Sequence, residues 1–238
     1  MSSLELKREY KALADPAQAK VLSGFFKTGK GQYGEGDVFL GIKVPVQRAA
    51  IKRHYDLALS DLQELLDDKV HEHRLSALFI LVKKFEAAVK VKDKKSQEAI
   101  YRFYLKNVGN INNWDLVDLS SPNIVGKYLL DKDRSSLHKM AKSAVLWERR
   151  IAVLATFTFI RDGDFDDILK MAAALLEDEH DLMHKAVGWM LREVGKRDVG
   201  ALRKFLDEHA PKMPRTMLRY AIEKLSEKDR RHYMNLKF

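Results

Sequence analysis

Cysteine is absent from the 238 residues of this chain, and no apolar run is long enough to span a membrane. Without cysteine the protein has no disulfide, no thiolate nucleophile and no cysteine-bound zinc. The charged amino terminus has no apolar core of the signal-peptide kind, so we expect neither export nor a membrane partner. These absences favour a cytoplasmic compartment.

Proline and glycine are also scarce, with five and twelve copies. Between them, apolar residues recur at intervals of three and four, which indicates helices, and no segment reads as a strand. A hydrophobic content of 46% is enough for a sizeable core. The sequence therefore predicts an all-α protein, and since nothing resembles a long linker we expect one domain over residues 1–238.

Four segments share a pattern in which a basic residue opens a long apolar run. They begin at Arg74, Arg150, Lys185 and Arg215, and a divergent unit covers residues 113–130. Spacings of about 30 to 40 residues are typical of HEAT-like helical pairs, which stack into a curved α-α solenoid. The four basic residues either line its concave face for a phosphate backbone or cap neighbouring turns, and both interpretations stay open.

Residues 29–45 are the one clearly irregular region. Gly29, Gly31 and Gly34 form a GxGxxG pattern, but a helical segment precedes it and no helix follows at once. This context excludes a dinucleotide-binding turn and leaves a flexible loop. Further on, Ser121 and Pro122 resemble a cap and the first position of a new helix.

Lysine and arginine outnumber aspartate and glutamate by 43 to 34, a formal charge of +9 that favours a polyanionic partner. A predicted helix over residues 181–196 gathers basic residues around a tryptophan on one face, formed by Lys185, Trp189, Arg192 and Lys196. The opposite face carries Met183, Val187, Met190 and Val194, so the tryptophan is not needed for burial. Its face suits a nucleic acid, or it covers a neighbouring helix among solvated cations.

Trp114 and Asp118 are four residues apart and therefore neighbours on a helix face. A carboxylate beside an indole suits the cationic sugar that forms when a glycosidic bond breaks. The segment by itself favours the alternative, a core tryptophan beside an aspartate that satisfies backbone donors at a turn. Arg150 lies in a nearly all-apolar helix over residues 146–161 and needs an anionic partner, either a carboxylate such as Asp115 or Asp118, or a phosphate. Arg161 lies on nearly the same face and either extends a phosphate track or is an ordinary solvated charge.

Two pairs of histidines lie close together in the sequence. His180 and His184 have the spacing of helical zinc ligands, but no third ligand is evident, so we expect no metal site. His71 and His73 are predicted to lie at the surface near a helix start.

Four segments, in this order and spacing, resemble the AlkD family of DNA alkylation repair glycosylases over nearly the whole chain. They are FLGIKVPVQR at 39–48, NNWDLVDL at 112–119, WERRIAVL at 147–154 and HKAVGWMLRE at 184–193. The resemblance implies a HEAT-like solenoid that holds duplex DNA and removes cationic N3- and N7-alkylated purines without a cofactor. It implies that Trp114 and Trp189 flank the damaged nucleotide, that Asp118 is the catalytic carboxylate, and that Arg150 contacts the backbone.

Asn113 departs from the family pattern, because the best-known member has a second tryptophan there. We expect a monomeric glycosylase that hydrolyses the N-glycosidic bond of 3-methyladenine and 7-methylguanine type lesions, with no obligate protein partner. Predicted DNA-binding residues are Lys185, Arg192, Lys196, Arg161, Arg48 and Arg215. The competing interpretations are a non-catalytic HEAT-like module for damaged or branched DNA and a protein-interaction scaffold.

Overall fold

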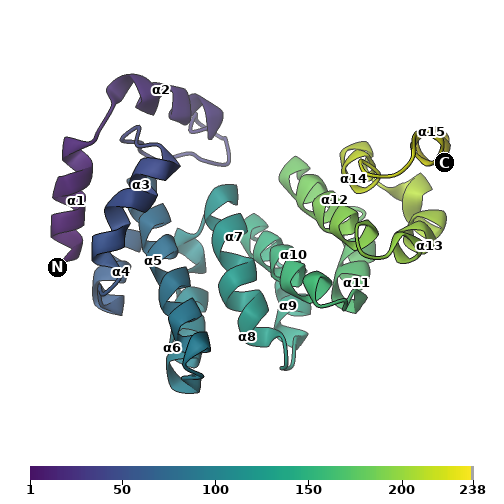
Figure 1. Ribbon diagram of the computed structural model, residues 1–238. Coiled ribbons are helices and arrows are strands. Elements are labelled where there is room, and N and C mark those ends of the chain that lie inside the picture. The colour runs from purple at the N-terminus through teal and green to yellow at the C-terminus, as the bar shows by residue number, and fades with distance from the viewer. Residues whose placement is uncertain (237–238) are drawn as a thin grey trace. The chain divides into compact units, whose positions relative to one another are not determined.

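A computed structural model describes residues 1–236, which fold into helices with no strand among them. The chain forms two compact units, Met1–Ile124 and Val125–Phe238. Figure 1 labels the helices of both units. An isolated parallel bridge pairs Val38 with Val70 within the first unit. The predicted all-α fold class is confirmed, whereas the single-domain organisation stays a prediction.

The first unit is built around one long helix, α5 (His71–Lys90), which contacts α3, α4, α6 and α7. The surrounding elements are α1 (Ser3–Ala12), α2 (Pro16–Phe25), α3 (Val44–Ala50), η1 (Ile51–His54), α4 (Leu59–Leu66), α6 (Lys94–Lys106), η2 (Val108–Asn110) and α7 (Trp114–Ser121). Their starts are encoded locally: Ser2 and Glu5 form a capping box at α1, and Asp15 caps α2, whose first residue is Pro16.

The second unit is built around α12 (Asp181–Gly195), which contacts α10, α11, α13 and α14. Its other elements are α8 (Lys127–Leu129), α9 (Ser135–Met140), α10 (Leu146–Arg161), α11 (Asp166–Ala174), α13 (Val199–His209), η4 (Ala210–Lys212), α14 (Arg215–Ala221) and α15 (Glu227–Asn235). A side chain at Gly188 would overlap the backbone of Met217, so this glycine lets α12 and α14 approach closely. The predicted helix 146–161 matches α10, most of which is buried.

The predicted helix start at Ser121 is wrong. Ser121 is the last residue of α7, and the chain continues through Pro122 into a π-helical segment, Pro122–Gly126. Proline has no amide hydrogen to donate, and a wider turn accommodates that loss without ending the helix. The side chain of Asn123 donates to the carbonyl of Leu119 at 2.8 Å and satisfies one backbone acceptor there.

Residues 26–43, between α2 and α3, form turns and no helix. Their end is held by Glu72, a buried carboxylate in the first turn of α5. Its Oε1 accepts from the backbone amides of Leu40, Gly41 and Ile42 at 3.0, 2.8 and 3.2 Å. Three converging amides form an anion-binding nest, which here binds a side chain of the same unit. Within residues 1–236, no helix is long and apolar enough to cross a membrane.

Candidate functional site

The two faces predicted for helix α12 are both present. Its apolar residues, namely Met183, Val187, Met190 and Val194, are fully buried. The basic residues of the other face have carboxylate partners: Lys185 pairs with Asp181 at 2.6 Å, Lys196 pairs with Glu193 at 2.6 Å, and Arg192 pairs with Glu223. These cations are therefore partly neutralised within the protein, and a phosphate would have to compete with the carboxylates.

Glu193 is the residue on this face that the sequence interpretation missed. It is 7% exposed, and its Oε1 accepts a hydrogen bond from the indole Nε1 of Trp189 at 3.2 Å. Lys196 donates to the same oxygen, and Arg197 lies 3.8 Å from the other. Glu193 therefore fixes the orientation of the indole. The signal was present in the sequence, since an i, i+4 pair places the two side chains together.

Helix α10 lies against this part of α12. Phe157 packs against Trp189 with ring centroids 6.0 Å apart, and the exposed Arg161 lies over the Phe157 ring at 5.7 Å. Arg150 is buried, and its Nη1 donates to the carbonyl of Leu182 at 2.6 Å. The second unit thus brings Arg150 and Trp189 onto neighbouring helices, with Arg161 beside the aromatic pair.

The other half of the predicted site, Trp114 and Asp118, lies on α7 in the first unit. Both side chains are half-buried and stand one helical turn apart. Asn113 caps the helix, because its Oδ1 accepts from the Trp114 amide at 2.8 Å. Trp114 and Asp118 therefore belong to the first unit, and Arg150 and Trp189 belong to the second.

The Trp114 indole stacks on Phe26, which comes from the segment after α2. The ring centroids are 5.2 Å apart with an interplanar angle of 15°. Phe25 meets the indole edge-on at 5.9 Å, and Phe25 is itself 60% exposed. One side of Trp114 therefore packs within the protein, as the core-anchor interpretation expected, although the residue is not fully enclosed.

A buried ionic cluster lies beside Trp114. His71 is 1% exposed; its Nδ1 lies 3.0 Å from Asp37 and its Nε2 2.8 Å from Asp115. Arg74 also pairs with Asp37 at 2.5 Å, and Asn113 donates to Asp37 at 3.3 Å. Asn113, which departs from the family pattern, therefore both caps α7 and donates a hydrogen bond to the buried Asp37.

Burial opposes the charge on His71, but Asp115 and Asp37 outweigh it and raise the histidine pKa to about 9. Burial also disfavours the Asp37 carboxylate, but its bonds to His71 and Arg74 lower its pKa below the usual value. The predicted surface positions of His71 and His73 are wrong, since both are buried. The buried His71 meets two carboxylates from distant parts of the chain, Asp37 and Asp115, whereas His73 lies 3.0 Å from Asp68 in the turn just before its own helix.

The basic residues that open the repeats have different partners within the protein. Arg74 donates to the carbonyls of Asp68 and Lys69, the turn before its own helix. Arg215 donates to the carbonyl of Met234 at 3.0 Å. Together with Arg150 on Leu182, these bonds favour the turn-capping interpretation over a ladder of equivalent cations. Arg48 lies over the Phe79 ring at 4.4 Å and is exposed, so its DNA contact stays a prediction.

The histidine pair of α12 bonds to backbone groups. His180 Nδ1 accepts from the Leu182 amide at 3.1 Å, and His184 pairs with the carbonyl of Asp178. No cluster of three metal-ligating side chains occurs in residues 1–236.

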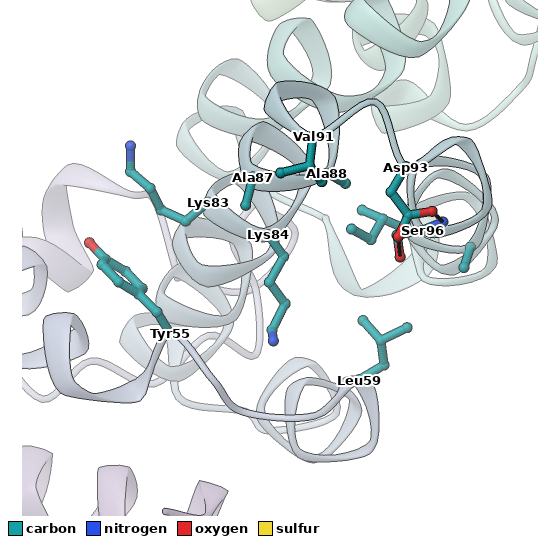
Figure 2. Close-up of a pocket in the computed structure, with 11 residues that line it drawn as sticks. Tyr55, Leu59, Lys83, Lys84, Ala87, Ala88, Val91, Asp93 and Ser96 are labelled. Atoms are coloured by element: carbon teal, nitrogen blue, oxygen red, sulfur yellow. Dashed lines mark hydrogen bonds between the residues drawn. The ribbon is translucent and has the colours of Figure 1, made fainter.

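A groove of about 660 Å³ lies in the first unit, away from all of these residues. It is drawn in Figure 2, where Tyr55 and Leu59 lie on the side of η1 and α4, and Val91 and Ser96 lie across from them. Its walls are mainly apolar, and Lys83 and Lys84 also line it. None of the predicted catalytic residues lines it.

Helical pairs packed around α5 and α12 define an all-helical protein of the helical-repeat class. A family model described as DNA alkylation repair enzyme matches residues 6–225, and the chain belongs to this family. Membership supports a role in DNA alkylation repair, with DNA as the substrate.

A solved structure described as a predicted DNA alkylation repair enzyme from Enterococcus faecalis has a similar fold. Its TM-score is 0.68 at 17% sequence identity, covering 90% of this chain and 97% of that one. This likeness supports the fold alone. The search of curated proteins finds no match.

Proposed function

We propose that the protein is a monofunctional DNA glycosylase that hydrolyses the N-glycosidic bond of cationic alkylated purines in duplex DNA. The observation that carries the proposal is the pairing of Trp114 and Asp118 on one half-buried helix face in a member of an alkylation repair family. The protein acts as a monomer and needs no cofactor, because alkylation already makes the base a good leaving group.

In the proposed reaction, the bond between C1′ and the base nitrogen breaks and its electrons neutralise the cationic ring. The Asp118 carboxylate stabilises the positive charge that develops on the sugar and positions the attacking water. Oxygen of that water bonds to C1′, and its released proton passes to solvent. No general acid is required, because the leaving base departs neutral.

The tryptophans provide electron-rich surfaces beside a cationic nucleotide. Trp114 is supported by Phe26, and Trp189 is oriented by Glu193, so each indole has a fixed direction. Arg150 contacts the DNA backbone in this proposal. Lys185, Arg192, Lys196, Arg161, Arg48 and Arg215 position the duplex.

The experiment is to incubate the purified protein with methylated duplex DNA and to identify the released bases by chromatography. We expect Asp118→Asn to abolish release of 3-methyladenine and 7-methylguanine while duplex affinity is kept or rises, since a negative charge is removed. Equal release by both proteins would refute the role of Asp118. Tight salt-dependent binding without release by the native protein would instead favour the non-catalytic DNA-binding module.

A matched pair of variants tests the α12 face. Lys185 and Lys170 both belong to the second unit, and each pairs with an aspartate four residues earlier. Lys185→Gln should weaken duplex binding and reduce the slope of log K against log salt by about 1. Lys170→Gln should leave both unchanged. Equal behaviour of the two variants would remove Lys185 from the DNA interface.

A further inference from the structure

His71 is held more tightly than its position at a helix start requires. Both ring nitrogens face carboxylates, Asp37 at 3.0 Å and Asp115 at 2.8 Å. The ring also packs against two phenylalanines, stacked on Phe39 at 4.7 Å and tilted against Phe26 at 4.9 Å, and these two rings stack on each other at 5.0 Å. These contacts together fix the orientation of the imidazole ring.

The two carboxylates determine the charge of the ring. A neutral imidazole has one N–H and can donate to one carboxylate, while its other nitrogen would direct a lone pair at the second. An imidazolium donates to both. The cluster is then balanced, with His71 and Arg74 opposite Asp37 and Asp115. Loss of the proton would leave a net negative charge in a buried site, which is costly.

The cluster joins the segment that packs on Trp114 to the helix turn that carries Trp114. Asp37 belongs to the irregular segment 26–43, and Phe26 of the same segment stacks on the indole. Asp115 is the residue after Trp114 in the first turn of α7, where it also accepts from the Leu116 amide at 2.9 Å. His71 thus contacts the indole's stacking partner on one side and the helix turn that carries the indole on the other.

We propose that the His71 imidazolium is a positioning residue for excision, which holds Trp114 against Phe26 by linking Asp37 to Asp115. This inference rests on the proposed glycosylase function. His71 acts through Trp114 and does not touch the substrate. Displacement of a group beside the reacting atoms by about 1 Å is enough to cost on the order of 100-fold in rate.

The first test replaces the ring by one that keeps the stacking and loses both hydrogen bonds, His71→Phe. The matched control is His54→Phe, since His54 is another buried histidine of the first unit, bonded to Glu9 at 3.2 Å. In single-turnover excision at saturating DNA, His71→Phe should lower the rate by at least about 10-fold with duplex affinity within about twofold. The control should keep the native rate. Equal losses in both variants would overturn the proposal.

The second readout does not depend on activity. Trp114 is the sole tryptophan of residues 1–124, so Trp147→Phe with Trp189→Phe leaves it as the reporter. We expect His71→Phe, added to this background, to increase acrylamide quenching of Trp114 about twofold, and His54→Phe to leave it unchanged. Unchanged quenching in His71→Phe would overturn the proposal that His71 holds Trp114 in place. This result can be read even if the native protein excises no base, so it is distinguishable from failure of the proposed function.

A pH profile tests the charge on His71. The histidine pKa of about 9 predicts that native excision falls as pH rises through that value. Asp115→Asn removes one of the two carboxylates, so the fall should move at least about one pH unit lower. Nuclear magnetic resonance of the His71 ring, without substrate, should show the same lowering of the His71 pKa in Asp115→Asn. This measurement tests the proposal even if His71→Phe does not fold. A His71 signal that titrates at its ordinary value would overturn the proposal.

Discussion

Replacement of Glu72 tests how the irregular segment before α3 is held. The Glu72 carboxylate is 1% exposed and accepts four close contacts from three backbone amides, those of Leu40, Gly41 and Ile42. In Glu72→Ala these three donors lose their acceptor. Since the nest is buried, water can replace the carboxylate only if the segment moves.

The magnitude follows from the number of donors. A buried unsatisfied donor costs about 1–3 kcal/mol, so three donors set a range of roughly 3–9 kcal/mol before relaxation. Partial entry of water favours the lower end, and we expect Glu72→Ala to lower the free energy of unfolding by about 4 kcal/mol. Glu72→Gln keeps an acceptor oxygen but loses the charge, which should cost about 2 kcal/mol.

The assay is equilibrium unfolding in urea, followed by fluorescence of Trp114 in the Trp147→Phe, Trp189→Phe background, which reports the first unit. The matched control is Glu86→Ala on the same helix, where a surface pair with Lys83 should contribute less than about 1 kcal/mol. A loss below about 1 kcal/mol in Glu72→Ala, or one no larger than in Glu86→Ala, would refute the role of the nest.

Three further outcomes are expected. Glu193→Gln should lower the excision rate by about 10-fold, because the Trp189 indole loses its fixed orientation, and should change duplex affinity little. The kinetics of base release measure this effect, and an unchanged rate would contradict the prediction. Gly41→Ala should destabilise by about 3 kcal/mol, since its φ is +87° and a side chain would overlap Asp15, whereas Gly31→Ala, with φ +75° and open space, should cost only about 1 kcal/mol in urea unfolding. Because folding raises the His71 pKa from 6.5 to about 9, stability from its proton is complete below pH 6.5 and is lost as pH rises through about 9. The loss is about 3 kcal/mol at ~1.4 kcal/mol per pH unit, and His71→Phe should not show this dependence.

Helix identity could be predicted from the sequence because it depends on local spacing. The spacing of apolar residues predicts one buried face for α12 and burial of most of α10. Capping residues such as Ser2 and Asp15 set the starts of other helices. The same local reasoning failed at Pro122, where a π-helical turn absorbed a residue that normally ends a helix. That outcome depends on packing of the surrounding helices, which no local pattern contains.

The candidate site divides in the same way. Trp114 with Asp118, and Trp189 with Glu193, are each four residues apart on one helix, so their proximity can be predicted from local sequence spacing. The partners of His71 cannot be predicted in this way, since Asp37 and Asp115 are 34 and 44 residues away along the chain. Their approach exists only after the first unit has folded.

The sequence alone determined the all-α class, the two faces of α12 and the order of motifs that resemble a repair family. Tertiary structure decided which charges are buried, which basic residues are paired with carboxylates, and what holds Trp114 in place. The physical reason is range: helical periodicity is set by residues three and four apart, whereas desolvation and ion pairing depend on neighbours in space.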